Sequence, residues 1–197
     1  MKNFFLLSLC LFSSSAFAFE VLEKSVVKVH SGLCQNQAVQ FKGSGVLFQY
    51  QNKVYVLTSE HVVLHGSAQE FCHWVQNSEW GKVSTQLKTA DWGYGLALLE
   101  IEKPSQDMLS QAVVLDLKAV ALQNKGQNIG VTTFGYPHQS KELAQDSSGK
   151  VLVLKSQRHE IPLLSYMVEL VDAHGEYGMS GGPVAFGDKN EFLGLLS

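Results

Sequence analysis

Short runs of apolar or alternating residues recur along most of this chain, and turn residues separate one run from the next. Val, Leu, Phe and Tyr dominate the runs, as expected for half-buried strands. The predicted strands are Ser25–Val29, Gly45–Tyr50, Val54–Thr58, Phe71–Val75, Lys82–Leu87, Leu96–Ile101, Val113–Leu117, Ile129–Phe134, Val151–Leu154, Tyr166–Leu170, Pro183–Phe186 and Phe192–Leu196. Short helices are predicted only after Ser59 and around Pro104–Gln111. Many short strands with regular turn spacing indicate a sandwich or a pair of barrels, and two halves of about equal length favour two small barrels.

Composition argues against two classes of protein. Hydrophobic residues make up 45% of the 197 residues and charged residues 17%, a balance that argues against intrinsic disorder. The net charge is −3 and Arg158 is the only arginine, which disfavours nucleic acid as a partner. Seventeen glycines against four prolines indicate tight turns, and Gln51-Asn52 between two strands predicts a short hairpin.

The first 18 residues have the pattern of a secretory signal peptide. Lys2 supplies the positive start, Phe4–Phe12 is apolar, and small residues lead to a cleavage site after Ala18. The apolar run is too short to cross the ~30 Å of hydrocarbon in a membrane. We therefore predict a secreted or periplasmic protein that keeps no membrane attachment after cleavage.

Two cysteines, Cys34 and Cys72, would remain after cleavage. Exported proteins usually pair their cysteines, so a Cys34–Cys72 disulfide is predicted. The alternative is a pair of free buried thiols.

Two motifs have the residue types of nucleophilic catalysis. In Thr58–Val62 a predicted strand ends and presents His61 at the start of a helical turn, where a proton acceptor would be rigidly held yet exposed. In Tyr177–Val184 the glycines around Ser180 allow a tight turn in which several backbone N–H groups converge. Either motif alone is weak evidence of catalysis, but the two together indicate hydrolytic chemistry.

The apolar strand Leu96–Leu99 lies between these two motifs, and their order resembles that of the trypsin/chymotrypsin-like serine peptidases. Among these, the motifs are most similar to those of bacterial HtrA-type and glutamyl-endopeptidase-type members. Gly43–Leu47 and Gly135–Pro137 resemble further family motifs, and the resemblance covers Val21–Ser197. It implies an all-β fold of two six-stranded antiparallel Greek-key barrels with a site between them.

The resemblance also implies roles for single residues. Ser180 would be the nucleophile that forms an acyl-enzyme, and His61 the general base. The backbone N–H groups of Gly178 and Ser180 would form the oxyanion hole. The implied function is an exported serine endopeptidase that acts on proteins or peptides and needs no cofactor and no metal.

The third member of the triad departs from the family pattern. Gly95 stands where the family places an aspartate, directly before the apolar strand. Asp91, four residues earlier, is a candidate only if the intervening segment loops back, and otherwise it is a turn residue. The departure raises an alternative function, a catalytically impaired pseudo-peptidase that serves as a protein-binding module.

Other departures concern activation and substrate choice. Met179 precedes the serine where many members have an aspartate that pairs with a new N-terminus, so packing or a ligand must hold the oxyanion hole. The chain ends at Ser197, where the family begins the strand beside the substrate pocket, so the second barrel is expected to lack its C-terminal end. His174 lies where members often place a pocket-floor residue and is a candidate for acidic specificity.

These interpretations divide the chain into a signal peptide at residues 1–18, a first barrel carrying His61 at 19–103, a connection at 104–118 and a second barrel carrying Ser180 at 119–197, all in one peptidase domain. A metal site is a minor alternative, because His61 and His65 have helical spacing but Val62 replaces the glutamate of zinc peptidases. The oligomeric state and the identity of the substrate stay open.

Overall fold

The computed structural model describes residues 22–35, 39–64, 71–91, 95–113, 129–146, 149–155, 166–171, 175–186 and 192–196. The predicted signal peptide, Met1–Ala18, lies outside these residues. No helix in the described ranges combines the length and the apolar character needed to cross a bilayer.

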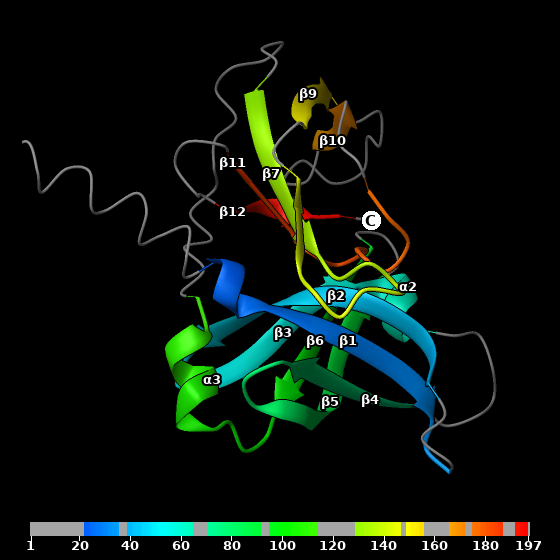
Figure 1. Ribbon diagram of the computed structural model, residues 1–197, viewed down its shortest axis with the longest axis vertical. Coiled ribbons are helices and arrows are strands. Elements are labelled where there is room, and N and C mark those ends of the chain that lie inside the picture. The colour runs from blue at the N-terminus through cyan, green and yellow to red at the C-terminus, as the bar shows by residue number, and fades with distance from the viewer. Residues whose placement is uncertain are drawn as a thin grey trace, which may run out of the picture.

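A closed barrel forms the first part of the fold (Figure 1). Its six strands are β1 (Val26–Leu33), β2 (Val39–Tyr50), β3 (Lys53–Ser59), β4 (Phe71–Asn77), β5 (Gly81–Asp91) and β6 (Leu96–Ile101). They follow the order β1-β2-β3-β6-β5-β4 and pair antiparallel throughout. The prediction of a six-stranded antiparallel barrel for this half is confirmed.

Alternating side chains explain why these strands close into a barrel. Along β3, Val54, Val56 and Thr58 are buried while the residues between them are more exposed. Such alternation sends every second side chain into the barrel interior. The interior is filled mainly by Val27, Val29, Leu47, Val54, Val56, Val75 and Leu99. The hairpin between β2 and β3 turns at Gln51 and Asn52, whose φ angles of 47° and 62° suit a type I′ turn.

The predicted disulfide is present between Cys34 and Cys72, whose Cα atoms are 4.9 Å apart. Cys34 follows β1 and Cys72 lies in β4, which pairs with β1. The bond therefore fastens two neighbouring barrel strands across a sequence separation of 38 residues.

Replacing both cysteines with serine is expected to lower the free energy of unfolding by about 4 kcal/mol, the loop-closure value for a ring of this size. Denaturant titration of the oxidised protein and of the Cys34→Ser/Cys72→Ser variant measures the loss. Reduced wild-type protein is the control and should match the variant. Equal unfolding midpoints for oxidised and reduced protein would show that the bond adds no stability.

A second, six-stranded antiparallel sheet lies above the barrel in Figure 1. Its strands are β7 (Ile129–Gly135), β8 (Ala144–Asp146), β9 (Lys150–Lys155), β10 (Tyr166–Val171), β11 (Pro183–Phe186) and β12 (Phe192–Leu195). The order is β10-β9-β7-β11-β12, with β8 paired to β7, and these described strands do not close on themselves. The all-β two-unit prediction is confirmed, with the second unit a smaller sheet. The strand predicted at Val113–Leu117 lies outside the described residues except Val113, which forms a single bridge with Phe48.

An apolar cluster joins the two units. Leu22, Val26 and Val46 from the first unit pack with Phe134 of β7 and Ala185 of β11. All five side chains are at most 3% exposed, so water is excluded from this junction as it is from a hydrophobic core. The relative position of the two sheets is thus fixed by packing.

Both predicted helices are present. Helix α2 is the single turn Glu60–Val63, and α3 covers Gln106–Gln111. The Ser105 hydroxyl caps α3 by accepting a hydrogen bond from the backbone N–H of Met108. Helix α2 carries His61 at the end of β3, as the sequence predicts.

Candidate active site

The loop that carries Ser180 is a tight, glycine-dependent turn directly before β11. Gly178 and Gly181 have φ angles of 100° and 86°, which non-glycine residues rarely adopt. A Cβ atom at Gly181 would also collide with the Ser44 carbonyl oxygen and the Thr58 hydroxyl. The glycines therefore let this loop lie against the first barrel.

Ser44 of β2 attaches the loop to the barrel. Its backbone N–H donates to the Ser180 carbonyl at 2.7 Å, and its hydroxyl donates to the Gly178 carbonyl at 2.9 Å. The same hydroxyl accepts from the Tyr136 N–H at 2.8 Å, and the Ser44 carbonyl accepts from the Thr58 hydroxyl at 2.6 Å. Ser44 is fully buried and out of reach of water. These hydrogen bonds therefore satisfy polar groups that would otherwise have no partner.

The turn that carries His61 meets the Ser180 loop at a shared acceptor. The Leu196 carbonyl accepts from the Ser59 hydroxyl at 2.8 Å and from the Gly181 N–H at 2.7 Å. Ser59 is two residues before His61, and Gly181 directly follows Ser180. The structure thus brings the segments of both predicted catalytic residues to one junction.

The exposure of the two side chains suits catalysis. Val62 and Val63 are buried and anchor α2, while the His61 side chain is 49% exposed. Ser180 is half-buried. Within the described part of the chain, no hydrogen bond joins the side chains of His61 and Ser180. Catalytic hydrogen bonds are often long or unaligned before substrate binds.

Glu60, which no sequence motif singles out, lies next to the ring of His61. Its carboxylate oxygen Oε2 lies 3.9 Å from Nδ1 of His61, and the Glu60 side chain is only 14% exposed. Its backbone N–H donates to the Gly95 carbonyl at 2.9 Å, so Glu60 lies beside the position where the family aspartate would stand. The available signal was an acidic residue adjacent in sequence to the candidate base.

Asp91, the candidate for the third triad member, ends β5 with an exposed side chain. Its carbonyl accepts from the Gly95 N–H at 2.9 Å, which closes a turn between β5 and β6. The recorded charge contact of the His61 ring, within the described residues, is with Glu60.

The backbone N–H groups of the Ser180 loop differ in whether they have a hydrogen-bond acceptor. The N–H groups of Met179, Gly181 and Gly182 all donate to carbonyl oxygens, at 3.0, 2.7 and 2.9 Å. No hydrogen bond recorded for the described part of the chain uses the N–H of Gly178 or Ser180. Those are the two N–H groups expected to form the oxyanion hole. Met179 is buried, so packing holds the loop.

Two further candidates lie outside the described residues, namely His174 of the expected substrate pocket and His65 of the minor metal alternative. Within the described ranges, no group of three or more His, Cys, Asp and Glu side chains could hold a metal ion.

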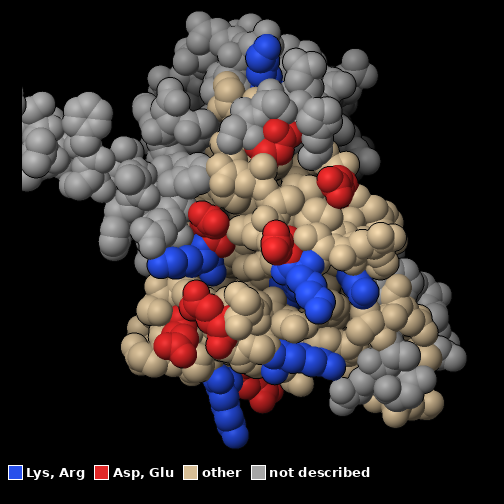
Figure 2. Space-filling view, in the orientation of Figure 1, with Lys and Arg blue, Asp and Glu red and all other residues tan. Residues whose placement is uncertain are grey.

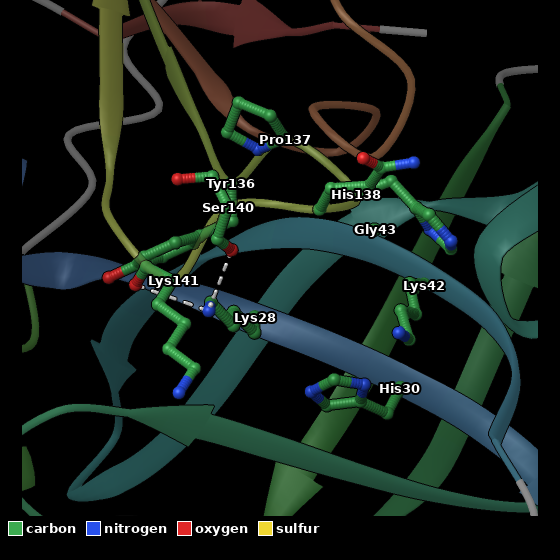
Figure 3. A pocket seen from close by; sticks show the side chains of 10 residues that line it. Lys28, His30, Lys42, Gly43, Tyr136, Pro137, His138, Ser140 and Lys141 are labelled. Atoms are coloured by element: carbon green, nitrogen blue, oxygen red, sulfur yellow. Dashed lines mark hydrogen bonds between the residues drawn. The ribbon is translucent and has the colours of Figure 1, made fainter.

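A cationic cavity of about 230 Å³ lies next to the Ser180 loop. Its lining residues are Lys28, His30, Lys42, Gly43, Tyr136, Pro137, His138, Gln139, Ser140 and Lys141. Figure 3 shows Lys28 reaching the carbonyl oxygens of Ser140 and Lys141, each at 3.2 Å. Figure 2 shows lysine side chains grouped near the middle of this face, with single acidic side chains above them.

Positive charge dominates inside this cavity. Burial, followed by the charges of Lys42 and Lys141, lowers the pKa of the Lys28 ammonium. Burial also lowers the pKa of His30 to about 4, and the charges of Lys42, Lys28 and Lys82 add to the effect. Burial raises the pKa of Tyr136, whose ring lies 4.8 Å from the Lys28 ammonium. His30 and Tyr136 are thus neutral at pH 7, and the lysines supply the charge.

Comparison with known proteins identifies similar folds. A family model described as the trypsin-like peptidase domain matches residues 43–195. Among solved structures, a serine endoprotease from Yersinia pestis matches with a TM-score of 0.62 and 20% sequence identity. The match covers 92% of this chain and 56% of that chain, so this chain spans little more than half the length of the Yersinia protein. No curated protein matches the sequence.

Proposed function

Because the chain belongs to the trypsin-like peptidase family, we propose that it is a serine endopeptidase with Ser180 as nucleophile and His61 as general base. The observation that carries this proposal is the junction at Leu196 and Ser44. There the Ser180 loop is seated beside the His61 turn, and the N–H groups of Gly178 and Ser180 have no recorded acceptor among the described residues.

The proposed reaction follows from these positions. His61 takes the proton of the Ser180 hydroxyl as its oxygen attacks the carbonyl carbon of the peptide bond. The N–H groups of Gly178 and Ser180 stabilise the negative oxygen of the tetrahedral intermediate. His61 then gives its proton to the leaving amine, and water hydrolyses the acyl-enzyme by the reverse sequence.

Glu60 is proposed as the positioning residue for His61, in place of the aspartate that Gly95 lacks. A carboxylate near Nδ1 holds the imidazole in one tautomer and stabilises the imidazolium that forms. Glu60 Oε2 is 3.9 Å from Nδ1, which is within ion-pair distance of a protonated ring but longer than a hydrogen bond. Asp91 is the competing candidate, and the contact between the Glu60 carboxylate and the His61 ring favours Glu60.

The substrate is proposed to be a protein or peptide that the enzyme encounters outside the cytoplasm. The family supports the substrate class. Export is an expectation from the signal-peptide pattern of Met1–Ala18. No cofactor enters the proposed chemistry.

The second candidate function is a binding module with little or no turnover. The observation that favours it is Gly95, which supplies no carboxylate to the His61 turn that packs on it. In the family template, losing the carboxylate while keeping the other two residues lowers turnover about 10⁴-fold. The two candidates therefore differ in measurable rate and share the fold.

Acyl-enzyme formation tests the proposal. We expect hydrolysis of a p-nitrophenyl ester to begin with a burst of about one product per active enzyme, because acylation precedes slower deacylation. Casein cleavage by the same preparation tests endopeptidase activity. Binding of casein without cleavage, together with no burst, would instead establish the binding module.

A further inference from the structure

We propose that the cationic cavity binds a carboxylate side chain of the substrate, so that the enzyme favours peptides with Asp or Glu close to the cleaved bond. This inference rests on the proposed function and names a substrate preference of the proposed peptidase. The lining of the cavity comes from β1, β2 and the loop after β7.

The cavity lies beside the backbone of the Ser180 loop. Gly43 lines it, and a Cβ atom built on Gly43 would come within 2.9 Å of the Ser180 carbonyl oxygen. His138 also lines the cavity; its N–H donates to the Tyr177 carbonyl at 2.7 Å, and a Cβ atom on Gly178 would lie 2.6 Å from the same nitrogen. A side chain in the cavity therefore belongs to a residue close to the bond held at Ser180.

The cavity lacks a balancing negative charge in its lining. Three lysines, Lys28, Lys42 and Lys141, line it, and no aspartate or glutamate does. Lys28 is partly satisfied by two neutral carbonyl oxygens, which do not neutralise its charge. An entering carboxylate would gain charge-assisted hydrogen bonds and relieve the repulsion among the lysines.

The size and position of the cavity select a peptide side chain. A volume of about 230 Å³ accommodates one side chain and is smaller than the ~300–1,000 Å³ of drug-sized ligand sites. An acidic residue of a bound peptide also arrives already tethered, which raises its effective concentration in the cavity.

Substrate profiling tests the inference. The experiment uses quenched peptides that carry Glu or Gln at each position around one cleaved bond, and it measures kcat/KM. We expect one position to favour Glu about tenfold, as a single charge-assisted contact would. Lys42→Glu should remove the preference and Lys42→Arg should keep it. Lys103→Glu, the same charge change at an exposed residue after β6, should leave it unaltered. Efficient cleavage without a Glu preference at any position would overturn the inference and leave the proposed function standing.

A binding measurement separates this inference from the catalytic proposal. In the Ser180→Ala variant, a Glu-containing peptide should raise the pKa of His30 from about 4, because a nearby carboxylate favours the protonated ring. The Gln peptide should not, and His30 is followed by NMR. If the wild-type protein hydrolyses neither ester nor casein while the variant gives this shift, the cavity is supported and the proposed function is rejected. Binding of inorganic phosphate without binding of the Glu peptide would overturn the inference in favour of a free-anion site.

Discussion

Replacing Ser180 with alanine is expected to lower kcat by about 10⁶-fold, the loss found when the nucleophile of a comparable triad is removed. Alanine cannot form the acyl-enzyme, so the ester burst should vanish along with steady-state turnover. Folding should be preserved, because the recorded contact of Ser180 at the junction is through its backbone carbonyl. The assay is ester hydrolysis with burst analysis, supported by circular dichroism of both proteins.

Ser84→Ala is the matched control for this loss. Ser84 is an exposed serine on β5, outside the loop and the cavity, and its replacement should leave kcat and the burst as in wild type. If Ser180→Ala retained more than a small fraction of the activity, another nucleophile or a contaminating hydrolase would be responsible.

Glu60→Gln is expected to lower kcat by an amount approaching ~10⁴-fold with little change in KM, the cost of losing the triad carboxylate in the family template. Glutamine keeps the size of the side chain but removes the charge that stabilises the imidazolium. The downfield Nδ1–H proton resonance of His61 should weaken in the same variant, which a purely structural role for Glu60 would not produce. Asp91→Asn and Glu102→Gln are the controls, and both residues are exposed.

A second substitution that restores a carboxylate near His61 tests the role of Glu60 more directly. Adding Gly95→Asp to the Glu60→Gln protein restores a carboxylate at the family position, and kcat should recover. Gly95 has a φ of 68°, a left-handed value that Asp tolerates better than most residues. A large loss in Asp91→Asn with none in Glu60→Gln would reverse the assignment and make Asp91 the third triad member.

The secondary structure was largely predictable because its signals are local. Alternation of apolar and polar residues marks strands such as β3 and β6, and the hairpin residues Gln51 and Asn52 mark the turn. Strand β8 was missed because Ala144–Asp146 has three residues and no apolar alternation. It is a strand because β7 supplies its hydrogen-bond partners, which is information from the tertiary fold.

The site was predictable only where a motif carries its chemistry. The segments of His61 and Ser180 meet as expected, but their catalytic roles stay predictions. The contact of Glu60 depends on how one helical turn is oriented, which no sequence pattern specifies. The cavity combines Lys28, Lys42 and Lys141, residues up to 113 positions apart, so only the packing of the two units reveals it.

Covalent labelling by an organofluorophosphonate tests the roles of Ser180 and His61, because such reagents react with an activated serine and spare ordinary hydroxyls. The folded wild-type protein is treated, digested and analysed by mass spectrometry. We expect a single phosphonyl group on Ser180, and we expect it to be lost when His61 is replaced with alanine. Failure of the native, folded protein to react, or modification of a different serine, would contradict the assignment of Ser180 and His61 as nucleophile and base.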